Sequence, residues 1–238
     1  MKTRSRGAAS DWASWMAGAC EQARDPRLAG FYGAFPHDPS APVADLPLIA
    51  IDLETTGLDP ARHAILSIGL LPFTLSSIRL SDRRHWVLRP PTGMSGESVR
   101  FHNITHSDTE QAPTMDEILT DLLTALAGRL PVVHYHPLER RFLQRALEQE
   151  LRQPLRFPLI DTMELEARRH RRGGLARLRH WLGRPPASLR LNDCRQRYGL
   201  PAYGTHHAVL DALATAELLQ AQIQHHYDAT TPVGELWV

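Results

Sequence analysis

The spacing of apolar and polar positions divides the chain into strands near the start and helices interleaved with shorter strands afterwards. Apolar runs typical of strands are followed by stretches with helical periodicity. The predicted strands are residues 47–54, 64–73, 79–88, 132–135 and 157–160, and the predicted helices are 115–127, 137–151, 189–198 and 207–225. Three strands followed by alternating helices and strands indicate an α/β fold, with a mixed sheet flanked by helices.

The first part of the chain has a different character. Residues 10–24 form an amphipathic pattern, and residues 34–47 are rich in proline and alanine, as linkers are. We therefore expect an N-terminal helical extension and linker over 1–46, a main domain over 47–228 and a tail over 229–238. The extension is expected either to pack on the domain as a strap or to bind a protein partner.

Composition limits the class of protein. Hydrophobic residues make up 42% and charged residues 22% of the 238 residues, as in ordinary globular domains. No apolar run approaches the length of a membrane span, so we expect no membrane association. Cys20 and Cys194 lie far apart and form no metal or redox spacing, which favours a reducing cytoplasm.

Two acids inside the first apolar run raise the question of function. Asp52 and Glu54 are two residues apart, so both side chains project from one face near the carboxyl end of a strand. Burying two such charges is costly unless a cation meets them, and oxygen ligands select Mg²⁺ or Mn²⁺. Alone, the pair is equally compatible with two unrelated acids at a solvated strand end.

Two later segments supply groups that would complete a metal-dependent hydrolase. Asp211 lies one turn into an apolar helix, and His206 comes five residues earlier, at or just before the helix start. Glu139 adds a fourth carboxylate in the first turns of the helix at 137–151. Carboxylates of this kind hold metal ions, and an imidazole accepts a proton from water.

Three ordered motifs resemble the DEDDh family of 3′–5′ exonucleases, which is related to the proofreading subunit of bacterial replicative polymerases. IDLETTGL is similar to the first family motif, HYHPLERRFL to the second and HHAVLDALATAELL to the third. VRFHNITHSD is similar to an H-G-I-T segment, and LIDTMELEARR to a D-T helix start at which Asp161 is expected to cap the helix. The similarity covers roughly residues 47–225, and three correctly spaced motifs are more specific than one.

The resemblance implies a ribonuclease H-like fold, two divalent ions, Mg²⁺ or Mn²⁺, and hydrolysis of single-stranded 3′ ends of DNA or RNA to nucleoside monophosphates. It implies that His206 is the general base. It also implies four metal ligands: Asp52, Glu54, Asp211 and Glu139. The residues that it places against the terminal nucleotide are Thr55, Thr56, Gly57, Leu58 and His102. Gly57 is equally explained by turn chemistry, and His102 by a structural role.

The second motif departs from the family pattern, H-N-x-x-F-D-x-x-F-L. Glu139 stands where aspartate is usual, Tyr135 replaces asparagine and Leu138 replaces phenylalanine. These departures keep open the alternative of a catalytically weakened nucleic-acid-binding module. A trimmer of short oligoribonucleotides also stays open, because nothing in the motifs distinguishes DNA from RNA.

Arginine supplies almost all of the positive charge, since Lys2 is the only lysine and the formal net charge is +1. This bias suits phosphate recognition, and codon usage explains it equally well. The densest cluster consists of Arg168, Arg169, Arg171, Arg172, Arg177 and Arg179. It predicts either a surface that follows a phosphate backbone or a solvated face balanced by Glu164 and Glu166.

Overall fold

A five-stranded sheet forms the centre of the computed structural model, which describes residues 5–36, 38–91, 104–171, 181, 183, 185–204 and 206–238. The strand order is β3-β2-β1-β4-β5. The strands are β1 (Leu48–Thr55), β2 (Ile65–Phe73), β3 (Arg84–Val87), β4 (Leu130–Val133) and β5 (Ile160–Asp161). β1 pairs antiparallel with β2 and parallel with β4, which confirms the predicted mixed sheet.

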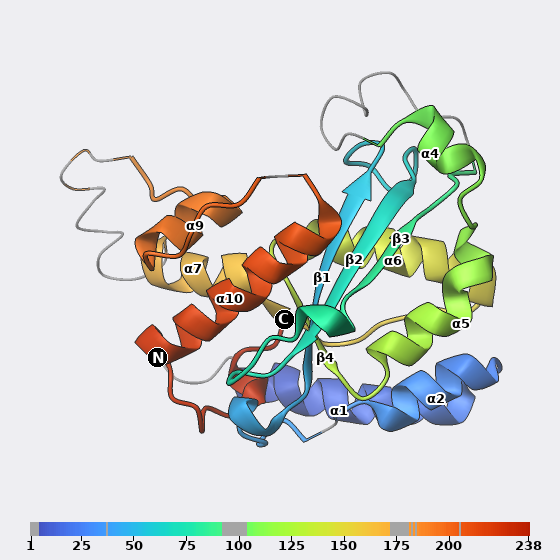
Figure 1. The fold of residues 1–238 in the computed structure, drawn as a ribbon. Coiled ribbons are helices and arrows are strands. Elements are labelled where there is room, and N and C mark those ends of the chain that lie inside the picture. The colour runs from blue at the N-terminus through green and yellow to red at the C-terminus, as the bar shows by residue number, and fades with distance from the viewer. Residues whose placement is uncertain are drawn as a thin grey trace.

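Helices cover both faces of this sheet. The described α-helices are α1 (Ser5–Gln22), α2 (Pro26–Ala34), α4 (His106–Glu110), α5 (Met115–Leu126), α6 (His136–Leu151), α7 (Thr162–His170), α9 (Leu191–Arg197) and α10 (Ala208–His226). Short 3₁₀ turns are η1 (Val43–Asp45), η2 (Leu80–Asp82) and η3 (Val233–Glu235). α10 lies along one side of the sheet, and α5 and α6 lie on the other (Figure 1).

The sequence predicted the long elements better than the short ones. The first two strands and the helices α5, α6 and α10 lie within one or two residues of their predicted bounds. The predicted third strand, 79–88, is instead a 3₁₀ turn followed by the short β3. The predicted strand at 132–135 begins earlier and ends at Val133, because Tyr135 has left-handed backbone angles.

The N-terminal extension packs into the same core as the sheet. Its first helix begins at Ser5 rather than at residue 10, and the sequence did not predict α2. Met16, Leu28, Phe31 and Tyr32 are each only 1% exposed and belong to the main hydrophobic cluster. Figure 1 shows α1 and α2 crossing beneath the end of the sheet at which β1 begins. The strap arrangement is thus what the structure shows, and a partner-binding role stays a prediction.

Candidate active site

Strand β1 positions the first two carboxylates. Asp52 lies opposite Gly69 of β2, and Glu54 lies opposite Ser67. Because side chains alternate along a strand, both acids project from the same face near the carboxyl end of β1. Ligand sites in open α/β sheets favour this end.

A glycine allows the third carboxylate to approach. An added Cβ at Gly69 would lie 2.3 Å from the backbone C and O atoms of Ala208, the first residue of α10. The start of α10 therefore packs directly on β2 at Gly69, the residue that pairs with Asp52. Asp211 lies in the first turn of this helix. Carboxylate oxygens of Asp52, Glu54 and Asp211 come within 4.8 Å of one another, as ligands of one ion would.

The electrostatics of this group favour a cation. Burial raises the pKa of Glu54 to about 8, and the charge of Asp211 adds to the shift. Burial also raises the pKa of Asp52 well above its usual range, assisted by Asp211, Glu139 and Glu54. The pKa of Asp211 is raised by burial as well, although the His206 N–H opposes the shift. Three carboxylates that resist ionisation together fit a divalent ion with oxygen ligands.

Glu139 lies close to this group without joining it. It is 4% exposed on α6, and its Oε2 atom has no hydrogen-bond partner among the described residues. Burial raises its pKa well above the usual range. Its charge also raises the pKa of Asp52, so the two carboxyls lie within electrostatic reach. A buried carboxylate oxygen without a hydrogen-bond partner fits a group that coordinates a metal ion.

His206 lies two residues before the first residue of α10 and donates a hydrogen bond to one of the carboxylates. Its backbone N–H donates to Asp211 Oδ2 at 3.0 Å, and its left-handed φ of 68° makes this turn possible. The residue is exposed, so its imidazole is accessible to solvent. The neighbouring His207 lies against His85, with ring centroids 5.1 Å apart. The sequence left His207 unassigned, and this contact gives it a packing role.

The loop after β1 is held by its own hydroxyls. Thr55 Oγ1 donates to the Gly57 carbonyl at 2.7 Å, and Thr56 Oγ1 accepts from the Ala64 N–H at 3.0 Å. An added Cβ at Gly57 would lie 2.6 Å from the His63 ring, so a larger residue there would require this ring to move. Leu58 is 79% exposed at the tip. The loop therefore presents an exposed apolar side chain at its tip. His102 lies outside the described residues.

A cavity of about 620 Å³ lies next to this loop. It is bounded by the β1–β2 turn, the segment after β3, the start of α5 and the exposed side of α6. His63 lines it and also lies 3.3 Å from Thr56 Oγ1, which connects the cavity with the loop. Arg62, Arg89 and Arg145 line it as well, together with the single acid Glu150, so basic residues outnumber acidic ones in its lining.

Asp161 has a larger role than the predicted helix cap. As predicted, it accepts from the Met163 and Glu164 N–H groups at the start of α7. It also accepts the Tyr135 N–H at 3.1 Å and the His136 N–H at 2.9 Å, and His136 Nδ1 lies 2.6 Å from Asp161 Oδ2. One buried carboxylate thus fixes the start of α6, which carries Glu139. The D-T pair was the signal for the cap, but no sequence signal reveals the second set of partners.

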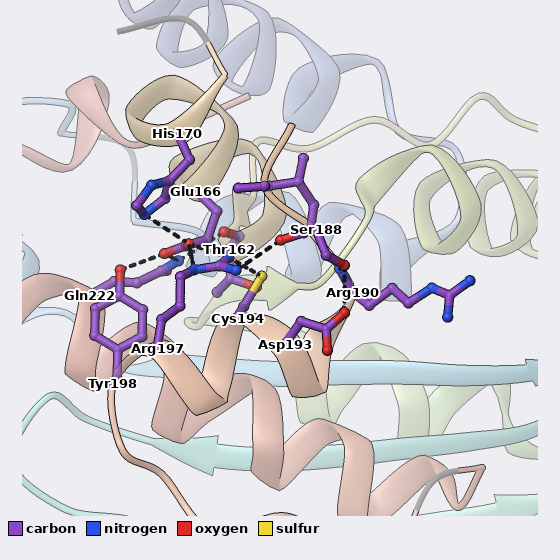
Figure 2. Close-up of polar contacts among 12 residues, drawn as sticks. Thr162, Glu166, His170, Ser188, Arg190, Asp193, Cys194, Arg197, Tyr198 and Gln222 are labelled. Carbon is purple, nitrogen blue, oxygen red and sulfur yellow. Dashed lines mark hydrogen bonds and ion pairs between the residues drawn. The ribbon is translucent and has the colours of Figure 1, made fainter. Parts of the chain in front are cut away.

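A second buried acid lies near the opposite end of α10 and is fully paired. Glu166 is 1% exposed and accepts from Arg197 NH2 at 2.6 Å, from Gln222 Nε2 at 3.0 Å and from the Tyr198 hydroxyl. Figure 2 shows these side chains converging on it from α9 and α10. This network joins α7 to α9 and α10 through side-chain hydrogen bonds. The expectation that Glu166 lies on a solvated arginine face is therefore wrong.

Two arginines of the predicted basic cluster are engaged by the protein itself. Arg168 pairs with Glu164 and donates to the Glu235 carbonyl, and Arg171 donates to the Ala187 carbonyl. Arg169 is exposed. The other three lie outside the described residues, so the phosphate-binding surface stays a prediction.

The fold and the position of the acids define a class of protein. This mixed sheet, with helices on both faces and acids at the carboxyl end of its central strand, is the ribonuclease H-like fold found in exonucleases. The chain belongs to the exonuclease family called RNase_T, whose profile matches residues 49–219. It is therefore a nuclease, and the resemblance to DEDDh exonucleases is confirmed.

Curated relatives agree with this assignment. The chain is 27% identical over 177 residues to the DNA polymerase III subunit epsilon of Treponema pallidum, covering 74% of this chain and 76% of that protein. It is also 27% identical over 174 residues to the PolC-type DNA polymerase III of Thermotoga maritima, covering 73% of this chain. The match spans only 12% of the PolC-type polymerase.

Solved structures show the same fold at low identity. Cell-death related nuclease 4 has a TM-score of 0.63 and 18% identity, covering 78% of this chain and 65% of that one. The nuclease domain of 3′hExo, a DEDDh family member bound to rAMP, has a TM-score of 0.59 and 16% identity, covering 76% and 92%. No helix in the described part of the chain is long and apolar enough to cross a bilayer. The cytoplasmic location stays a prediction.

Proposed function

We propose that the chain is a metal-dependent 3′–5′ exonuclease that removes nucleoside monophosphates from single-stranded 3′ ends of DNA or RNA. The observation that carries this proposal is the convergence of Asp52, Glu54 and Asp211 oxygens within 4.8 Å. The buried, unpartnered Oε2 atom of Glu139 adds a fourth candidate ligand. Structural neighbours solved with DNA or with a histone mRNA stem-loop support a nucleic-acid substrate.

These four carboxylates would hold two divalent ions, Mg²⁺ or Mn²⁺. Bound ions of this kind generate a nucleophile from water and stabilise charge on the leaving oxygen. His206 would accept the proton of the attacking water. The backbone N–H of His206 donates to the Asp211 carboxylate, which would link the position of the base to that of a metal ligand. Gly57 and Leu58 would lie against the terminal nucleotide, with Leu58 wedged at a base.

Phosphate binding beyond the terminal nucleotide would fall to arginine. The cavity beside the β1 loop presents Arg62, Arg89 and Arg145 around an apolar floor that includes Phe142. Phosphate contacts supply much of the affinity for nucleic acid and make it salt-dependent. We therefore expect the apparent affinity to fall as the salt concentration rises.

The test is a side-by-side digestion of 5′-labelled single-stranded DNA, duplex DNA with a 3′ overhang, RNA and dinucleotides. Each is assayed with Mg²⁺, with Mn²⁺ and with EDTA. We expect metal-dependent ladders that shorten from the 3′ end. Asp52→Asn should abolish them, whereas Asp82→Asn, at an exposed acid in η2, should not change them. Internal cuts without a ladder would refute the proposed polarity.

The two alternatives from the sequence give different outcomes in this assay. A trimmer of short oligoribonucleotides would digest the RNA and dinucleotides and leave long DNA intact. A weakened binding module would retain oligonucleotides without cutting them. The position of Glu139 outside the three-carboxylate group is the observation that keeps this last alternative open.

A further inference from the structure

The face of the sheet that carries the acids extends across β2 to the edge strand β3. Gly69 of β2 pairs with Asp52 on one side and with His85 of β3 on the other. In the next row, Glu54 pairs with Ser67. Directly opposite residues of an antiparallel pair lie on one face, and so do residues i and i+2 of a strand. These five residues therefore share the face on which α10 begins at Gly69.

His85 connects this face of the sheet with the residue that precedes α10. Its Nε2 atom lies 2.8 Å from the Ser67 hydroxyl oxygen, and Ser67 is only 1% exposed. A buried hydroxyl needs a hydrogen-bond partner, and the imidazole supplies one. The second contact of His85 is with His207, because the two ring centroids are 5.1 Å apart at an interplanar angle of 31°. The His85 ring is therefore bonded to β2 and packs on His207.

His207 lies between the proposed base and a proposed metal ligand. It is the N-cap residue of α10, and its carbonyl accepts the Asp211 N–H at 3.0 Å. His206, directly before it, has a left-handed φ of 68°, a conformation that persists in a residue other than glycine only where its surroundings hold it. A side-chain cap commonly fixes such a helix start, but the His207 side chain makes no capping hydrogen bond. Packing on His85 is therefore a contact that can hold this turn.

We propose that His85 is a positioning residue for the exonuclease reaction, whose ring holds the turn formed by His206 and His207 and keeps the base beside Asp211. This inference rests on the proposed exonuclease function and adds a residue from the edge strand β3. His85 acts through His207, and not through the substrate or the metal ions. Its loss should therefore slow the chemical step and leave the binding of substrate and metal unchanged.

The experiment compares the wild type with His85→Ala, His85→Phe and His85→Gln on a 5′-labelled single-stranded oligonucleotide. His85→Ala removes both contacts and should lower kcat roughly 10-fold, which is less than the ~10²–10⁴-fold loss expected when a general base is removed. KM and the metal concentration for half-maximal rate should not change. His85→Phe keeps a ring on His207 and should restore most of the rate. His85→Gln keeps a hydrogen-bonding group for Ser67 without the ring and should be as slow as His85→Ala.

Three controls separate positioning from a loss of fold. His85 is exposed, so His85→Ala leaves no buried cavity and should lower Tm by only roughly 2–4 °C, the effect of one lost hydrogen bond in a chain of this size. His85→Gln should keep the wild-type Tm although its rate is low. Arg84→Ala changes the preceding exposed residue of β3, on the opposite face, and should not change kcat. The double variant of His85→Ala and His207→Ala should be no slower than His207→Ala alone, because His85 acts through His207.

Each result decides the proposal. A wild-type kcat for His85→Ala would overturn it and leave the exonuclease function intact, and so would a higher KM at unchanged kcat or losses that multiply in the double variant. Imidazole NMR of the metal-free protein gives an answer without turnover: His85→Ala should shift the ring signals of His206 and His207 and leave that of His170, at the end of α7, unchanged. If the wild type cuts no oligonucleotide, the exonuclease proposal fails, and an unmoved His206 signal would separately show that His85 does not position this turn.

Discussion

Gly69→Ala should separate the catalytic helix from the sheet without changing any proposed catalytic residue. The added Cβ would lie 2.3 Å from the Ala208 C and O atoms and 2.5 Å from the Val209 N atom. These are backbone atoms, so no side-chain rotation relieves the clash. Ordinary contacts of a Cβ begin at 3.4 Å, so the start of α10 must move by about 1.1 Å, which is the difference between 3.4 and 2.3 Å.

The displacement reaches the site because Asp211 lies in the first turn of the same helix. A misplacement of about 1 Å costs roughly 10²-fold in rate. Overpacking of this kind also costs about 1–3 kcal/mol of stability. For a chain of this size, each kcal/mol lowers Tm by roughly 2–4 °C. We therefore expect a folded protein with a modestly lower Tm and a large loss of kcat.

The assay measures kcat, the metal concentration for half-maximal rate and Tm on the same preparations. Gly30→Ala is the matched control, since an added Cβ there meets nothing within 4 Å and alanine favours the helix α2. It should keep the wild-type rate and raise Tm slightly. The reasoning is refuted if Gly69→Ala keeps both the wild-type rate and its metal dependence.

Further predictions concern the site and the extension. Glu139→Gln should raise the metal concentration for half-maximal rate, and Glu139→Asp should do so less; unchanged metal dependence for Glu139→Gln would remove this residue from the site. His206→Ala should lower kcat about 10²–10⁴-fold with little change in metal affinity; a near-normal rate would move the base role elsewhere. The folded pKa of Glu54, about 8, exceeds its unfolded value of roughly 4.3, so its contribution to metal-free stability is present below pH 4 and lost as pH rises through 8. Mg²⁺ should then raise Tm more at pH 8.5 than at pH 5, and an equal gain at both would contradict this. A chain beginning at Ala44 should unfold at a much lower temperature, because it lacks the buried Phe31 and Tyr32; an unchanged Tm would show that the extension is dispensable.

Local periodicity predicts the strand and the helix that carry the acids, but it does not predict that the acids lie close together in the fold. Alternation along β1 is enough to place Asp52 and Glu54 on one face, and helical spacing is enough to place Asp211 in α10. Their convergence depends on a contact between Gly69 and Ala208, which are 139 positions apart. A glycine inside a strand pattern signals a close backbone approach, but it does not say which segment approaches.

Proline explains why the strand next to β1 was misplaced. β4 includes Pro131, and proline lowers the expectation of an interior strand because it lacks an N–H. The predicted strand therefore started at 132, one residue beyond the proline. It also extended through Tyr135, because valine and tyrosine are enriched in strands. The structure ends β4 at Val133, and the N–H groups of Tyr135 and His136 donate to Asp161 in the turn that follows.

The sequence does not predict which buried acids will have hydrogen-bond partners. Glu166 and Glu139 both follow helical spacing on amphipathic helices, and neither position reveals whether a partner will meet it. Hydrogen bonds from Tyr198, Gln222 and Arg197 hold the pKa of Glu166 below its usual value in spite of burial, so it is a closed structural network. Burial raises the pKa of Glu139, and its Oε2 atom is left without a partner. The same residue type is thus fully paired at one position and lacks a partner for one oxygen at the other, and only the donors from distant helices distinguish the two.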